Sequence, residues 1–170
     1  MSQDSLYDEA AEAYGAALDR LARAYELDPE ARRDLLQEIH LQLWRSLAQF
    51  DQRCSLRTWV YRVAHNVATT HVIRQRRIRN RLMSIEDVDA MSVNESGELA
   101  AGKAQALDRL SRLIERLNPL DRQIIVSYLE GMNAAAIGEI TGMPAANVSA
   151  KVHRIKNVLK RWFGEGGADA

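Results

Sequence analysis

The most distinctive feature of this chain is a basic segment without a single acidic residue. Eight arginines lie between Arg53 and Arg81, and the run from Gln52 to Ile85 holds neither Asp nor Glu. The whole chain balances 23 basic against 23 acidic residues, so this polarity is local. Arginines bind phosphates, and the aromatic and amide side chains of the same segment can bind exposed bases. The sequence therefore indicates a nucleic acid as the first partner to consider.

One face of this segment combines an aromatic ring, a guanidinium group and an amide. Trp59, Arg62 and Asn66 are spaced i, i+3 and i+7, which places them on one side of a helix. The alternative is that Trp59 and Tyr61 are core aromatics and that the arginines form a solvated surface. The arginine cluster favours binding more clearly, because its members have no acid nearby in sequence: Arg74, Arg76, Arg77, Arg79 and Arg81.

A second basic segment, from Ile140 to Gly164, holds five bases and no acid. A short helix is predicted from Ala134 to Ile140, and Gly142 can adopt the left-handed conformation that reverses the chain. Pro144 then opens a basic helix. A helix, a tight glycine turn and a basic helix are typical of a helix-turn-helix. An ordinary helical hairpin with a solvated basic face fits this spacing about equally well.

The two helices of this second segment would share a core and present a polar face. The expected core residues are Ile137, Ile140, Val148, Val152 and Ile155. The residues expected to face outward are Asn147, Ser149, Lys151, Arg154 and Lys156.

Catalytic and metal-binding patterns are weak in this sequence. The single cysteine, Cys54, excludes an internal disulfide and a cysteine-based zinc site. His65 and His71 are six residues apart, which puts them on different faces of a helix. No phosphate-binding glycine loop or nucleophile elbow occurs, so we expect no cofactor and no metal, and an enzyme is the least favoured class.

The N-terminus and the hydropathy pattern bear on location. Residues 1–12 are polar and acidic and do not form a signal peptide, and no apolar run is long enough to cross a bilayer. The sequence predicts a soluble, cytoplasmic protein without membrane insertion.

Apolar residues follow a helical period along nearly the whole chain, which predicts an all-α fold. Helices are expected at about 14–25, 28–50, 55–77, 107–117, 119–131, 133–141 and 144–162, with Ser55 as a helix N-cap and a loop at 51–55. The predicted organisation is two small helical domains, 1–81 and 105–163, joined by a flexible acidic linker at 82–104 and followed by a tail at 164–170.

Several motifs resemble a known family. The segments Asp34–Glu38 (DLLQE), Trp44–Phe50 (WRSLAQF) and Thr58–Asn66 (TWVYRVAHN) resemble region 2 of bacterial sigma factors, in particular the extracytoplasmic-function (ECF) group. Region 4 of that group is similar to Leu117–Gln123 (LNPLDRQ), Tyr128–Gly131 (YLEG), Ile137–Gly142 (IGEITG) and Val148–Lys156. The two matches follow the family's order and together cover most of the chain. One departure is Gly138, which replaces a usual alanine and should weaken its helix slightly.

The resemblance implies a transcription initiation factor. Such a protein binds core RNA polymerase and directs it to specific promoters. Region 2 contacts the clamp helices and recognises and melts the minus-ten element of promoter DNA. Region 4 binds the minus-thirty-five element through its helix-turn-helix and contacts the polymerase flap. Many members are held by an anti-sigma factor, and the sequence leaves open whether one binds here.

The resemblance also assigns residues by position. It places Asp34, Gln37, Glu38 and Leu41 against core polymerase. It places Gln52, Arg53, Arg57, Trp59, Arg62, Asn66, Thr70, Arg74, Arg76 and Arg77 on the minus-ten element, with loop 51–55 capturing a flipped base. It places Asn147, Ser149, Lys151, His153, Arg154 and Lys156 on the minus-thirty-five element.

Two other classes remain open from the residues alone. A helix-turn-helix regulator that binds duplex DNA without polymerase would need no clamp-binding surface. A helical adaptor for protein interactions would show no salt-dependent binding of DNA by either domain.

Overall fold

The computed structural model describes residues 2–83 and 102–165, and all of their regular secondary structure is α-helical. The helices are α1 (Gln3–Tyr25), α2 (Pro29–Leu47), α3 (Leu56–Met83), α4 (Gly102–Glu115), α5 (Pro119–Leu129), α6 (Ala134–Thr141) and α7 (Ala145–Glu165). The predicted all-α class is confirmed. Most of the predicted flexible linker, residues 84–101, lies outside the described residues.

Four helices are longer than the sequence indicated, since α4 begins at Gly102, five residues before its expected start. α1 begins at Gln3 because Ser2 caps it, accepting a hydrogen bond from the N–H of Ser5, and because Leu6 and Ala10 are buried. α3 continues to Met83, since arginine is a good helix former and needs no buried face to extend a helix. α7 likewise continues to Glu165. The predicted linker and tail therefore overlap helix ends.

Local capping sets where the other helices begin and end. Asp28 and Asn118 each precede a proline and accept a hydrogen bond from the N–H three residues on. The Ser55 hydroxyl accepts one from the N–H of Thr58 at 3.1 Å, as predicted for the start of α3. Gly142 ends α6 at φ 77°, the left-handed conformation that the turn requires.

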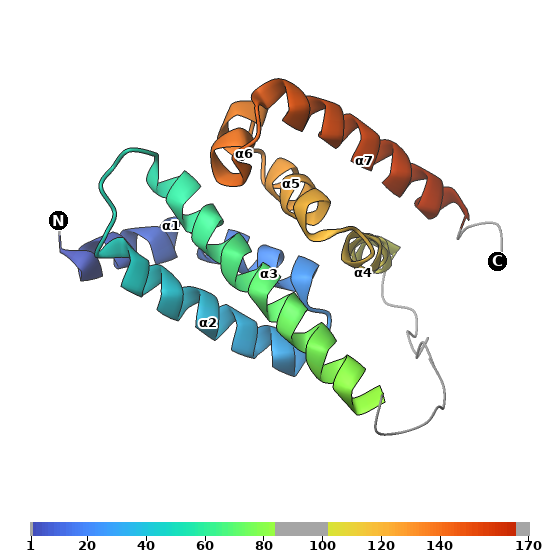
Figure 1. The fold of residues 1–170 in the computed structure, drawn as a ribbon, viewed down its shortest axis with the longest axis horizontal. Coiled ribbons are helices and arrows are strands. Elements are labelled where there is room, and N and C mark those ends of the chain that lie inside the picture. Colours follow the sequence, from blue (N-terminus) through green and yellow to red (C-terminus); the bar gives the residue numbers. More distant parts are fainter. Residues whose placement is uncertain (1, 84–101, 166–170) are drawn as a thin grey trace.

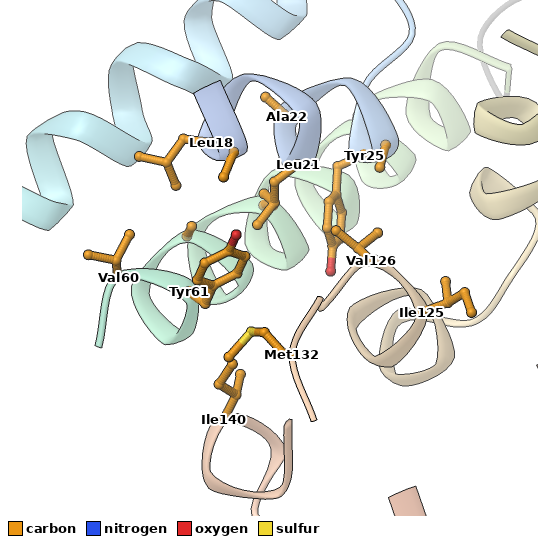
Figure 2. Close-up of a cluster of buried hydrophobic side chains, with 14 of the residues drawn as sticks. Leu18, Leu21, Ala22, Tyr25, Val60, Tyr61, Ile125, Val126, Met132 and Ile140 are labelled. Atoms are coloured by element: carbon orange, nitrogen blue, oxygen red, sulfur yellow. The ribbon is translucent and has the colours of Figure 1, made fainter. Parts of the chain in front are cut away.

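The helices form two packed groups that lie against each other (Figure 1). α1, α2 and α3 pack together, and α7 lies along α4, α5 and α6. α4 also contacts α1, while α5 and α6 contact α3. Figure 2 shows the junction, where Leu21 and Tyr61 from the first group face Val126 and Met132 from the second. One continuous apolar core thus fixes α3 and α7 relative to each other in this arrangement.

Candidate nucleic-acid interface

The far part of α3 carries exposed cations and a polar groove. Arg74, Arg76 and Arg77 are exposed and make no hydrogen bond or ion pair with other described residues. Asn66, Thr70 and Arg74 line a groove of about 630 Å³ between α2 and α3. The Thr70 hydroxyl donates to the main-chain carbonyl of Asn66 at 2.9 Å, and the Asn66 side chain is exposed. This surface can hold a single strand, with arginines on phosphates and an amide on a base.

The opposite wall of this groove belongs to α2. Asp34 and Glu38, which the sequence placed against polymerase, line it together with Gln42. Sequence reasoning missed Gln42, His71 and Gln75, which also line the groove. Only the packing of α2 on α3 brings them there.

The outer face of α2 is a stripe of polar and apolar side chains open to solvent. Asp34, Gln37, Glu38 and Leu41 are all exposed, as their predicted role requires. Trp44 continues the stripe and is 40% exposed, although its indole N–H is held by Asp4 at 2.9 Å. The i, i+3, i+7 spacing of Gln37, His40 and Trp44 was the signal that could have identified it. A large, partly exposed aromatic side chain is typical of a protein-binding surface.

Trp59 is held inside the packing between α2 and α3. Its indole N–H donates to the Ser46 hydroxyl at 3.0 Å, and its ring packs against Phe50 with centroids 5.3 Å apart. The ring is half-buried and contacts the core cluster. The structure thus favours the core alternative for Trp59 and separates it from the exposed Asn66.

Arg57 and Arg62 are turned toward the second group of helices. Arg57 donates to the carbonyl of Glu130 at 2.5 Å, and Arg62 donates to the carbonyl of Glu139 at 2.8 Å. The Thr58 hydroxyl donates to the Glu139 carboxylate at 3.2 Å. Two of the predicted minus-ten arginines are therefore already bound within the chain.

Glu130 is the main charged anchor between the two groups. Its carboxylate accepts two hydrogen bonds from Arg20, at 2.6 and 2.7 Å, and one from the Tyr61 hydroxyl at 3.4 Å. Hydrogen bonding to Glu130 raises the pKa of Arg20. Burial, followed by the nearby Glu130 charge, raises the pKa of Tyr61 to about 12. Tyr61 therefore stays neutral and donates its proton.

A buried polar chain crosses the same junction. The Ser127 hydroxyl donates to the Gln123 carbonyl, so it accepts from Nε2–H of His65 at 3.0 Å. Nδ1 of His65 then accepts from the Tyr25 hydroxyl at 2.8 Å. Burial lowers the pKa of His65 to about 3 and raises the pKa of Tyr25. His65 is thus a neutral structural residue that links α1, α3 and α5.

The helix-turn-helix has the predicted core. Ile137, Ile140, Val148 and Ile155 are buried, and Val152 is partly buried. Gly138 lies against the turn, because a Cβ there would stand 2.6 Å from the Met143 carbonyl oxygen. Glycine is thus needed at this position for close packing.

The outer face of α7 is only partly as expected. Asn147, Ser149, His153, Arg154 and Lys156 are exposed. Lys151 is instead paired with Asp121 at 2.7 Å, with both side chains mostly buried. The amide of Asn157, which sequence reasoning missed, is exposed and lies 3.3 Å from the His153 ring nitrogen. Ser149, His153 and Asn157 recur every four residues, which was the available signal.

Loop 51–55 connects α2 to α3 with a preformed geometry. Gln52 has φ 61°, which is uncommon for a residue other than glycine. Asp51 accepts from the N–H of Arg53 at 3.2 Å and pairs with its guanidinium at 3.0 Å. Gln52 and Arg53 are exposed, as their predicted role requires.

Comparison with known proteins agrees with this geometry. Residues 10–78 match the family model for sigma-70 region 2, and residues 107–159 match that for sigma-70 region 4. The chain is 25% identical over 138 residues to the ECF RNA polymerase sigma factor SigX of Bacillus subtilis. The aligned region covers 79% of this chain and 71% of SigX.

Two solved structures share the fold at 17% sequence identity. CnrH, in complex with the cytosolic domain of CnrY, matches with a TM-score of 0.68 over 94% of this chain and 88% of CnrH. The sigma factor RpoE, in complex with the anti-sigma factor NepR from Bartonella quintana, matches with a TM-score of 0.66 over 93% of this chain and 96% of RpoE.

Fold, surfaces and sequence similarity define a factor that directs RNA polymerase to promoters. The chain belongs to the ECF group of RNA polymerase sigma factors. A polymerase-independent regulator is not favoured, because region 2 is present in addition to the helix-turn-helix. Within the described residues, none of the helices is long and apolar enough to cross a membrane.

Proposed function

We propose that this chain contacts the minus-ten strand with α3 and loop 51–55, the minus-thirty-five duplex with α7, and the clamp of core polymerase with the outer face of α2. The supporting observation is that two exposed basic surfaces lie on two separate groups of helices. A single DNA site for one domain would leave the other surface without a role, whereas two promoter elements account for both.

Region 2 would hold melted DNA along the α3 side of the groove, which carries Asn66, Thr70 and Arg74, opposite the acidic α2 wall. The Asn66 amide can bind the edge of an unpaired base, and Arg74, Arg76 and Arg77 can bind the phosphates that follow. Thr70 lies one turn beyond Asn66 on α3 and would contact the DNA next to the base that Asn66 binds. Arg53, at the loop, would bind phosphate on the other side.

Region 4 would read duplex DNA with one face of α7. Asn147, Ser149, His153 and Arg154 are exposed on the helix that follows the glycine turn. Their mixture of amide, hydroxyl, imidazole and guanidinium groups offers both donors and acceptors to base edges in a major groove.

Full use of the minus-ten surface would be favoured by separation of the two groups of helices. One guanidinium nitrogen of Arg57 and one of Arg62 donate to the main-chain carbonyls of Glu130 and Glu139, so opening the junction would leave all of their donors available to phosphate. Polymerase, by binding the two regions at separate places, would supply the free energy that opens this junction. The two arginines would then join the minus-ten surface.

We also extend three general properties to this chain. It would act without catalysing a covalent reaction and would work in the cytoplasm, where RNA polymerase is. CnrH and RpoE were solved with the cytosolic domain of CnrY and with the anti-sigma factor NepR. A protein of that kind would hold this chain in its closed arrangement.

Run-off transcription with purified chain and core polymerase tests the proposal. The chain should support initiation at defined promoters. Asn66→Ala should reduce open-complex formation without weakening polymerase binding. Asp34→Arg should abolish co-purification with core polymerase, whereas Asp8→Arg, an equal charge change at an exposed site on α1, should not. If no promoter on any genomic template were used, the proposal would be wrong.

A further inference from the structure

The first turns of α1 are joined to the last turns of α2 by three polar contacts. Gln3 donates from Nε2 to the main-chain carbonyl of Trp44 at 2.7 Å, and the indole N–H of Trp44 donates to Oδ1 of Asp4 at 2.9 Å. The Tyr7 hydroxyl lies 3.0 Å from Nδ1 of His40, and the two rings meet edge to face with centroids 6.0 Å apart. Figure 1 shows the start of α1 beside the end of α2.

The contacts use one face of each helix. Asp4 and Tyr7 are three residues apart on α1, and His40 and Trp44 are four apart on α2, so each pair lies one above the other along its helix. The α1 residues precede the part of the chain that matches sigma-70 region 2, which begins at residue 10. The α1 side of this contact therefore lies outside the matched family region.

Trp44 is the member of the exposed α2 stripe that these contacts hold. Its side chain is 40% exposed, and Leu41, one turn before it, is 42% exposed. The indole N–H is the only polar atom of the ring, and its bond to Asp4 turns that edge of the ring toward α1. Gln3 holds the main chain at the same residue. Both the ring and the backbone of Trp44 are thus fixed from α1.

Holding an exposed ring before it binds raises the affinity for a partner. A side chain that must give up its rotamer freedom on binding lowers affinity by a factor of about two to ten. An ionised carboxylate is a strong acceptor for an N–H group, and Asp4 makes no other hydrogen bond or ion pair with described residues. The carboxylate is therefore engaged in orienting the ring.

We propose that Asp4 is a positioning residue that fixes the Trp44 ring in the orientation that core polymerase binds. This inference rests on the proposed role of the outer face of α2 in polymerase binding. Asp4 acts through the indole N–H of Trp44, so an uncharged acceptor at the same place serves the same purpose, whereas a side chain without an acceptor does not.

Titration of the full chain with core polymerase tests this role by the Kd of each variant. Asp4→Ala should raise Kd about fivefold. Asp4→Asn should keep most of the wild-type affinity, because its amide oxygen still accepts from the indole. Asp8→Ala is the matched control. It removes an exposed acid one turn further along α1 and should bind polymerase as the wild type does.

A double-mutant cycle separates positioning from a general effect on the fold. Trp44→Phe keeps an aromatic ring but has no N–H, so adding Asp4→Ala to it should change Kd by less than about twofold. The NMR signal of the Trp44 indole N–H, assigned by its loss in Trp44→Phe, should shift in Asp4→Ala and stay near its wild-type position in Asp4→Asn. A fivefold loss in the Trp44→Phe background would overturn the proposal, because Asp4 would then act on α1 itself.

The outcomes distinguish this inference from the proposed function. If the wild type bound core polymerase and Asp4→Ala bound it equally well, the role of Asp4 would be wrong and polymerase binding by α2 would stand. The same conclusion would follow if Asp4→Asn bound as weakly as Asp4→Ala, since only the charge would then matter. If the wild type did not bind core polymerase at all, the proposed function would fail, and the role of Asp4 with it.

Discussion

The two basic helices of this protein differ in what their cations contact. Near the start of α3, Arg57 and Arg62 donate to carbonyl groups of the other group of helices. On α7, Arg154 is exposed, and Lys151 is the cation that pairs with an acid among the described residues. The same signal in the sequence, a run of bases without acids, thus corresponds to one partly masked surface and one largely open surface.

This difference indicates an order of events. On the proposed function, the exposed face of α7 would meet a duplex as it stands, whereas Arg57 and Arg62 at the start of α3 would first exchange their carbonyl acceptors for phosphate. The junction combines an apolar core, the Glu130 anchor and the buried His65 chain. On the proposed function, the strength of these contacts would set how readily the chain engages the minus-ten element.

The largest expected effect concerns the support of α7. In Gly138→Ala the new Cβ would lie 2.6 Å from the Met143 carbonyl oxygen, so the backbone of the turn must shift. We expect a loss of about 3 kcal/mol of unfolding free energy, at the upper end of overpacking costs. Urea unfolding measures it. The control, Gly15→Ala, meets open space in α1 and should stabilise the protein by about 0.5–1 kcal/mol.

Equal effects of the two alanines would show that only helix propensity matters. DNA binding is a more specific readout than stability. The Gly138→Ala variant should bind a minus-thirty-five duplex more weakly, whereas its α2 surface should still bind core polymerase. Loss of both together would mean that the two groups of helices do not unfold separately.

The next effect is a pH dependence at the junction. The pKa of His65 is lowered to about 3 in the folded chain and returns to about 6.5 on unfolding. The unfolded chain therefore binds more protons between these values, and the stability that the neutral His65 contributes falls as pH falls below 6.5. From pH 6.5 to 5 the loss should be about 2 kcal/mol.

Urea unfolding at several pH values, compared between the wild type and His65→Gln, isolates this contribution. Gln is uncharged at all these pH values, so the variant should lack the His65 part of the slope, while other groups titrate alike in both proteins. Parallel pH profiles for the two proteins would contradict a buried neutral His65.

A smaller effect concerns the Glu130 anchor. Glu130→Gln removes the ion pair with Arg20 but keeps the carbonyl that accepts from Arg57. Because the Arg20 side chain is 60% exposed, we expect less than about 1 kcal/mol of lost stability. The junction should nevertheless open more often. A fluorescence pair on α2 and α7 should report a longer mean distance, and Glu12→Gln should leave that distance unchanged.

The sequence predicted those features that depend on local pattern. Periodic apolar spacing located the helices, and Gly142 and Ser55 marked a turn and a cap that the structure confirms. The partners of Arg57 and Arg62 are 73 and 77 residues away along the chain, so no local pattern reveals them. Trp59 illustrates the same limit, because an aromatic residue on a helix face looks alike whether it binds a base or packs against Phe50.

The smallest effect compares two cations on α7 and tests whether it is as open as we infer. Arg154 is exposed and available to a phosphate, whereas Lys151 would have to leave Asp121, 2.7 Å away, before it could bind one. Arg154→Gln should therefore reduce the salt dependence of minus-thirty-five duplex binding by about one counterion. Lys151→Gln should leave that slope unchanged and lower stability slightly. Equal slopes for the two variants would mean that DNA displaces Asp121, so that α7, like α3, exchanges an internal acceptor for the promoter.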